Sequence, residues 1–138
     1  MAVWENFKSM PVLLKFLTAH AFACFAFLLV SVIPNNSFSI DGHAASYAEW
    51  WSSGAGPFAS LLGLVGPIIG VLLVTKSQNA RPAYLGFLAL GLIVPYPVMG
   101  VPAMALAGVV VACAVAFYLY KWQSVHSYFA LTIRSTRP

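Results

Sequence analysis

The sequence predicts an all-α, polytopic membrane protein with four transmembrane helices and a short interfacial helix in its first outer loop. Of its 138 residues, 61% are hydrophobic and only 7% are charged, and its mean hydropathy is +0.86. A soluble domain carries about 25% charged residues, so these few charges cannot cover a surface that faces water. The lipid bilayer is therefore an expected partner. The length allows one domain, and we expect residues 1–138 to form a single four-helix transmembrane domain.

Four apolar runs define the expected spans, which cover about 12–33, 57–75, 82–97 and 102–121. A bilayer core about 30 Å thick needs roughly 20 helical residues, and the first, second and fourth runs supply them. The third run has only about 14 residues before Pro95, or roughly 21 Å of helix. It must either continue through Pro95 as a kinked helix or end in a turn over 95–102 that dips into the bilayer.

Basic residues indicate the orientation of these spans. All the Lys and Arg residues fall on one side of the expected membrane: Lys8, Lys15, Lys76, Arg81, Lys121, Arg134 and Arg137. Loops rich in Lys and Arg stay in the cytoplasm. We therefore expect a bacterial-type inner (plasma) membrane with both termini cytoplasmic, and no nucleic-acid partner. A cleaved signal peptide is not expected, because the first apolar run exceeds the roughly 7–15 residues of a signal-peptide core.

The outer segment 35–56 carries readable local signals. An Asp-Gly pair at 41–42 follows a strand-like stretch and predicts a tight turn. Ser46 and Glu49 have the spacing of a capping box, which predicts a short helix with three aromatic residues: Tyr47, Trp50 and Trp51. Aromatic rings at this height are typical of the membrane interface. We expect an interfacial helix, with a cap over a ligand or a docking site as the alternative.

His20 is the main candidate for chemistry, because ionisable groups inside a span are functional hypotheses. No Asp, Glu or Arg lies within any expected span. Cys24 lies one turn after His20 on the same helix face, and Cys113 lies in the fourth span. These donors make an incomplete metal site, so we expect no metal and no cofactor. The favoured interpretation is a neutral His20 bonded to a neighbouring helix, and the alternatives are contact with a ligand and metal binding.

Small residues form stripes on two of the expected spans. They occur at 63, 66 and 70 in the second span and at 108, 112 and 116 in the fourth: Gly63, Gly66, Gly70, Gly108, Ala112 and Ala116. Such stripes let helix backbones approach closely. We expect packing within the bundle, and the alternative is a surface for another membrane protein.

Several membrane chemistries require residues that the spans lack. Proton coupling needs a carboxylate, disulfide chemistry needs a CxxC pair, and haem ligation needs paired histidines at similar depth. We therefore expect a small non-enzymatic protein that acts by binding. It would be an accessory or assembly subunit, or a protective immunity-type factor, for another membrane protein or through self-association. The alternative is an oligomeric transporter or channel for a weakly polar or lipid-like solute.

Overall fold

The computed structural model describes residues 2–35, 37–40 and 42–134, which are mostly helical. The elements in chain order are α1 (Ala2–Ser9), α2 (Val12–Ala23), α3 (Phe25–Val32), β1 (Ser39–Ile40), β2 (His43–Ala44), α4 (Tyr47–Ser52), α5 (Ala55–Val74), α6 (Ala80–Leu92), α7 (Pro95–Val98), α8 (Pro102–Lys121) and α9 (Gln123–Arg134). Within the described residues, three helical stretches are long and apolar enough to cross a membrane: Val12–Val32, which joins α2 and α3, Ala55–Val74 and Pro102–Lys121. These stretches indicate a membrane protein in contact with lipid.

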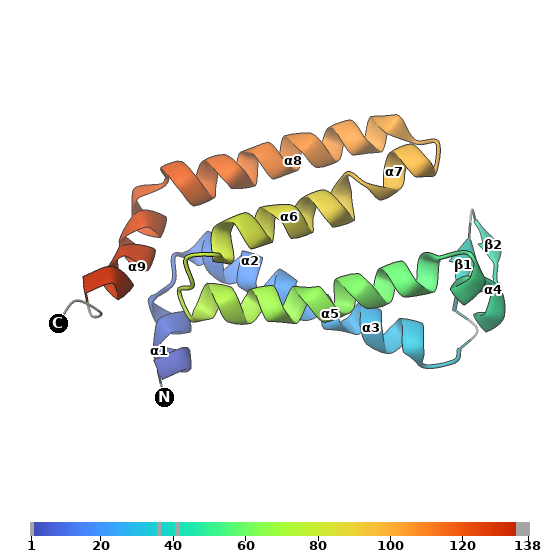
Figure 1. The fold of residues 1–138 in the computed structure, drawn as a ribbon, viewed down its shortest axis with the longest axis horizontal. Coiled ribbons are helices and arrows are strands. Elements are labelled where there is room, and N and C mark those ends of the chain that lie inside the picture. The colour runs from blue at the N-terminus through green and yellow to red at the C-terminus, as the bar shows by residue number, and fades with distance from the viewer. Residues whose placement is uncertain (1, 36, 41, 135–138) are drawn as a thin grey trace.

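Toward one end of the molecule the long helices form an open row (Figure 1), whereas toward the other end α2 also lies against α6 and α8. α5 packs along α2 and α3 on one side and along α6 on the other, and α6 and α7 pack along α8. The α6–α8 pair diverges from α3 and α5 toward the end that holds α4 and α7. α1, α9 and the loop between α5 and α6 lie at the opposite end. We call this the basic end, because its elements carry Lys8, Lys15, Lys76, Arg81 and Lys121.

The chain from 80 to 98 differs from the single span expected over 82–97. α6 has 13 residues, or about 20 Å of helix, and it ends where Ile93 adopts φ −119° and ψ −52°. Pro95 and Pro97 lack backbone N–H groups and cannot continue the hydrogen-bond ladder of α6. The chain instead forms the four-residue helix α7 and turns at Gly100, whose φ is +73°.

α5 begins at Ala55, two residues before the expected start of the second span. Gly54 precedes it with φ +87°, a left-handed conformation that glycine adopts without steric cost. Pro57 still falls in the first turn of the helix, where its missing N–H has no intrahelical partner to lose. α5 then continues through Pro67 to Val74.

The capping box predicted in the outer segment is confirmed. The Glu49 amide donates to Ser46 Oγ at 3.3 Å, while the Ser46 amide and hydroxyl donate to Glu49 Oε2 at 2.8 and 2.7 Å. These hydrogen bonds stabilise the carboxylate and lower the pKa of Glu49. β1 and β2 form an antiparallel hairpin at the expected turn, with Ile40 paired to His43. Asp41, expected to start the turn, lies outside the described residues.

The aromatic residues of α4 direct their polar atoms at the end of α3. Trp50 Nε1 donates to Ser31 Oγ at 3.3 Å, and Trp51 Nε1 donates to the Ser31 carbonyl at 3.2 Å. The Tyr47 hydroxyl donates to the Val32 carbonyl at 3.1 Å. The last carbonyls of a helix have no partner within that helix. α4, which we call the outer cap, therefore satisfies two carbonyls at the end of α3.

The most continuous core lies toward the basic end, where α9 folds back over the loop after α5. The Tyr128 hydroxyl donates to the carbonyls of Leu73 and Val74, each at 3.3 Å. Burial raises the pKa of Tyr128 to about 12. Lys76 Nζ lies 4.6 Å from the centre of the Tyr128 ring, and the Arg81 guanidinium lies 4.5 Å from that of Phe129. Cation–π contacts of this kind hold α9 against the protein.

Candidate functional site

A glycine in α5 creates the junction on which the candidate site is built. A Cβ added to Gly66 would lie 2.6 Å from the Ala21 carbonyl oxygen, 2.8 Å from Cys24 Cβ and 3.5 Å from the Phe87 ring. The first two distances are shorter than real Cβ contacts, so only glycine fits here. α2 and α6 therefore approach each other across α5 at this level. This approach places His20 beside α6.

His20 lies between α2 and α6, about 12 Å along α2 from its start. Its Nδ1 lies 3.1 Å from the Tyr84 hydroxyl, and its Nε2 lies 3.9 Å from Cys24 Sγ. The imidazole also lies against Phe87, with 6.1 Å between ring centres. We call these four residues the His20 cluster. Tyr84 is only 1% exposed, whereas His20 itself is exposed at the surface of the row.

Each ring nitrogen of His20 has a partner inside the protein. In one tautomer Tyr84 donates to Nδ1 and Nε2–H faces Cys24 Sγ, while in the other Nδ1–H donates to Tyr84 and the thiol donates to Nε2. Both partners of the imidazole within the described residues are uncharged groups, a hydroxyl and a thiol. One side of the His20 residue stays exposed at the surface of the molecule.

Cys113, the third sequence candidate, is exposed on α8 and is a free thiol, as is the buried Cys24. Within the part of the chain that the structure describes, no group of three His, Cys, Asp or Glu side chains comes together. His20 and Cys24 supply two donors, whereas a zinc site uses three or four protein ligands.

The small-residue stripes lie at contacts within the molecule. A Cβ on Gly63 would meet the backbone nitrogen of Leu28 in α3, and one on Gly70 would lie 3.0 Å from the Phe22 ring. In α8, a Cβ on Gly108 would meet the Leu92 carbonyl of α6. Ala112 and Ala116 follow at the next turns of α8 and are half-buried.

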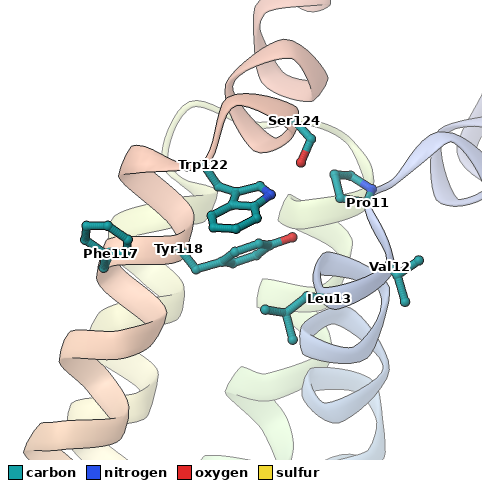
Figure 2. A pocket seen from close by; sticks show the side chains of 7 residues that line it. All are labelled: Pro11, Val12, Leu13, Phe117, Tyr118, Trp122 and Ser124. Atoms are coloured by element: carbon teal, nitrogen blue, oxygen red, sulfur yellow. The ribbon is translucent and has the colours of Figure 1, made fainter.

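A cavity of about 470 Å³ opens at the basic end between α2 and the α8–α9 corner. Its lining residues are Pro11, Val12, Leu13, Phe117, Tyr118, Trp122 and Ser124. Figure 2 shows the Tyr118 ring projecting from α8 toward Leu13, with the Trp122 indole beside it. Among the described residues, the buried Tyr118 hydroxyl has no side-chain hydrogen-bond partner and lies near the backbone of Leu14.

Tyr84 and Tyr118 were not among the candidates from the sequence. Tyr84 carries the one hydroxyl of α6, and Tyr118 is one of two tyrosines in the largely apolar helix α8. A hydroxyl within an apolar stretch is the signal that could have identified them. Their contacts with α2 join residues far apart in the chain, which helical periodicity does not reveal.

Comparison with known proteins adds no family. No family model, no curated protein and no solved structure matches the chain.

Proposed function

We propose that this chain is a small, non-enzymatic protein of a bacterial-type inner (plasma) membrane that acts by binding a membrane partner. Its role would be that of an accessory or assembly subunit, or of a protective immunity-type factor. The observation that carries this proposal is the exposed edge of the His20 cluster. Polar groups in membrane proteins face the interior of an assembly rather than lipid. Here His20 is exposed at the surface of the molecule, so a second membrane protein or a second copy would complete the enclosure.

Four crossings belong to the same proposal. α5 and α8 both run toward the basic end, so the chain between them must return across the bilayer if both helices span it. α6 and α7 supply that return path, with α8 beside them to satisfy the interrupted backbone. The positive-inside rule then assigns the basic end, with both termini, to the cytoplasm. Arg137, which also supports this assignment, lies outside the described residues.

Labelling of single cysteines tests the topology. Ser77→Cys lies in the loop at the basic end, and Gly100→Cys lies in the turn at the opposite end; both are placed in a Cys24→Ala, Cys113→Ala background. A membrane-impermeant maleimide applied to intact cells is expected to label position 100 and to spare position 77. Equal labelling of the two positions would contradict four crossings.

Site-specific photo-crosslinking tests the binding role. Phe16 lies one turn before His20 and is 67% exposed, so a benzoyl-phenylalanine fits there with little disturbance. The expected result is one discrete protein adduct in native membranes, either with a partner or with a second copy, that disappears in the His20→Leu background. The matched position is Leu106 on α8, which is 69% exposed and should give lipid adducts. Lipid adducts alone at both positions would overturn the proposal.

A transporter or channel built from several copies is the second candidate. The helix interruption between α6 and α7 favours it, because discontinuous helices mark the binding sites of many transporters. The cavity in Figure 2 is not lined by His20, so a path past His20 would have to form between copies. A solute flux in proteoliposomes that rises with protein density and is lost in His20→Leu would support this candidate over the first.

A further inference from the structure

We propose that the cavity at the basic end binds one anionic phospholipid of the adjacent leaflet, with its phosphate at the Tyr118 and Ser124 hydroxyls and an acyl chain along Leu13. This inference concerns a site other than the His20 cluster and does not depend on the function proposed above.

The place of the cavity determines which molecules can reach it. Its walls come from the first residues of α2 and the last residues of α8, so it lies where two membrane-crossing helices meet the interface. Trp122, on its rim, is 56% exposed, and tryptophan is enriched at this height in membrane proteins. Phospholipids are the molecules that fill this level of a bilayer. A volume of about 470 Å³ falls within the roughly 300–1,000 Å³ of ligand pockets.

The lining combines apolar side chains with hydrogen-bonding groups, which match the acyl chains and the phosphate of a phospholipid. Val12, Leu13 and Phe117 offer apolar surface, and each acyl CH₂ buried there contributes about 0.8 kcal/mol. Tyr118, Trp122 and Ser124 add two hydroxyls and an indole N–H, all of which can donate to phosphate oxygens. The hydroxyl of Tyr118 matters most, because it is buried and, apart from the nearby backbone of Leu14, has no hydrogen-bond partner within the described part of the chain. A buried polar group without a partner costs about 1–3 kcal/mol, and a bound phosphate would remove that cost.

Two basic residues that are close in the chain to the lining residues favour an anionic headgroup at this end of the molecule. Lys121 directly precedes Trp122, and Lys15 follows Leu13 by two residues. Of the acidic residues in the sequence, Glu5 is the one nearest in the chain, and it pairs with Lys8 at 3.5 Å. Basic pockets between transmembrane helices bind anionic headgroups, at about 1 kcal/mol for each nearby Lys or Arg. The cavity is therefore expected to prefer phosphatidylglycerol to phosphatidylcholine.

Native mass spectrometry of the full chain released from nanodiscs tests the proposal. In mixed phosphatidylglycerol and phosphatidylcholine, the wild type is expected to retain one phosphatidylglycerol at least fivefold more often than one phosphatidylcholine. Leu13→Trp fills the cavity and should reduce this retention at least tenfold. Tyr118→Phe removes only the hydroxyl and should reduce it about threefold to tenfold. Val110→Trp is the control: Val110 lies on α8 and is 69% exposed, so this variant should leave lipid retention unchanged.

A second cavity-filling variant and a competition experiment complete the test. Val12→Trp also fills the cavity, from a side chain that is 70% exposed, and it replaces Leu13→Trp should that variant fail to fold. Soluble glycerol phosphate in excess should not displace the lipid, because it lacks the acyl chain; displacement would assign the site to free phosphates instead. Retention that is equal for the two headgroups, or that survives both filling variants, would overturn the proposal.

Discussion

Replacing Gly63 by alanine tests the packing of α5 against α3 most directly. The added Cβ would lie 2.7 Å from Leu28 Cβ and 2.9 Å from its Cα, and it would also meet the backbone nitrogen of that residue. These atoms belong to a helix backbone and cannot move aside as a flexible side chain would. Overpacking of this kind costs about 1–3 kcal/mol.

Gly86→Ala provides the matched control. Gly86 lies within α6, and a Cβ there would meet nothing within 4 Å. The same substitution should therefore express only the helix preference of alanine over glycine, a gain of about 0.5–1 kcal/mol. The two variants should differ in free energy of unfolding by about 1.5–4 kcal/mol.

Titration with sodium dodecyl sulfate in mixed micelles, followed by circular dichroism, measures this difference. Gly63→Ala should unfold at a lower denaturant fraction than the wild type, and Gly86→Ala at an equal or higher fraction. If Gly63→Ala were as stable as Gly86→Ala, the close approach of α5 to α3 would be refuted.

Three further substitutions address the outer cap and α9. Ser31→Ala removes a hydroxyl that accepts an indole N–H and should lower the free energy of unfolding by about 1 kcal/mol. Ser60→Ala is the control, because the buried Ser60 hydroxyl has no partner among the described residues. It should leave the free energy of unfolding unchanged or raise it. Hydrogen bonds lower the pKa of Glu49. The stability that the Glu49 carboxylate gives to α4 is therefore present above the ordinary carboxyl pKa and is lost as pH falls through the lowered pKa. Tryptophan fluorescence should show this acid transition in the wild type and not in Glu49→Gln. Arg81→Ala removes a cation–π contact to α9 worth about 0.5–2 kcal/mol and should speed amide hydrogen exchange in α9, and unchanged exchange would contradict the proposed attachment.

The sequence predicted those features that depend on residues close together in the chain. The three candidate spans follow from apolar runs, and the start of α4 follows from the spacing of Ser46 and Glu49. Pro95 also indicated an irregular third span. The path of that irregularity was not predictable, because it depends on which parts of α8 lie beside the interrupted backbone.

Contacts between distant segments account for what the sequence did not predict. Tyr84 meets His20 across 64 positions of the chain, and nothing in the periodicity of α6 marks its hydroxyl. The interfacial interpretation of Trp50 and Trp51 used their aromatic character alone, whereas their N–H groups are bonded to Ser31. The cavity arises from the meeting of two helix ends, which no local pattern describes.

The open row has a mechanical consequence. Helix pairs α3–α5 and α6–α8 each include a position where glycine brings the two backbones together. Each pair should therefore move as one rigid unit. The two pairs are joined through α5 and α6, which pack less closely. A Cβ added to Gly91 in α6 would lie 3.8 Å from the Leu62 side chain of α5, which is an ordinary contact distance. Closely packed elements slide and pivot rather than deform. We therefore expect the softest motion of the molecule to be a rotation of the two helix pairs relative to each other, with its pivot near the basic end and its largest displacement at α4 and α7.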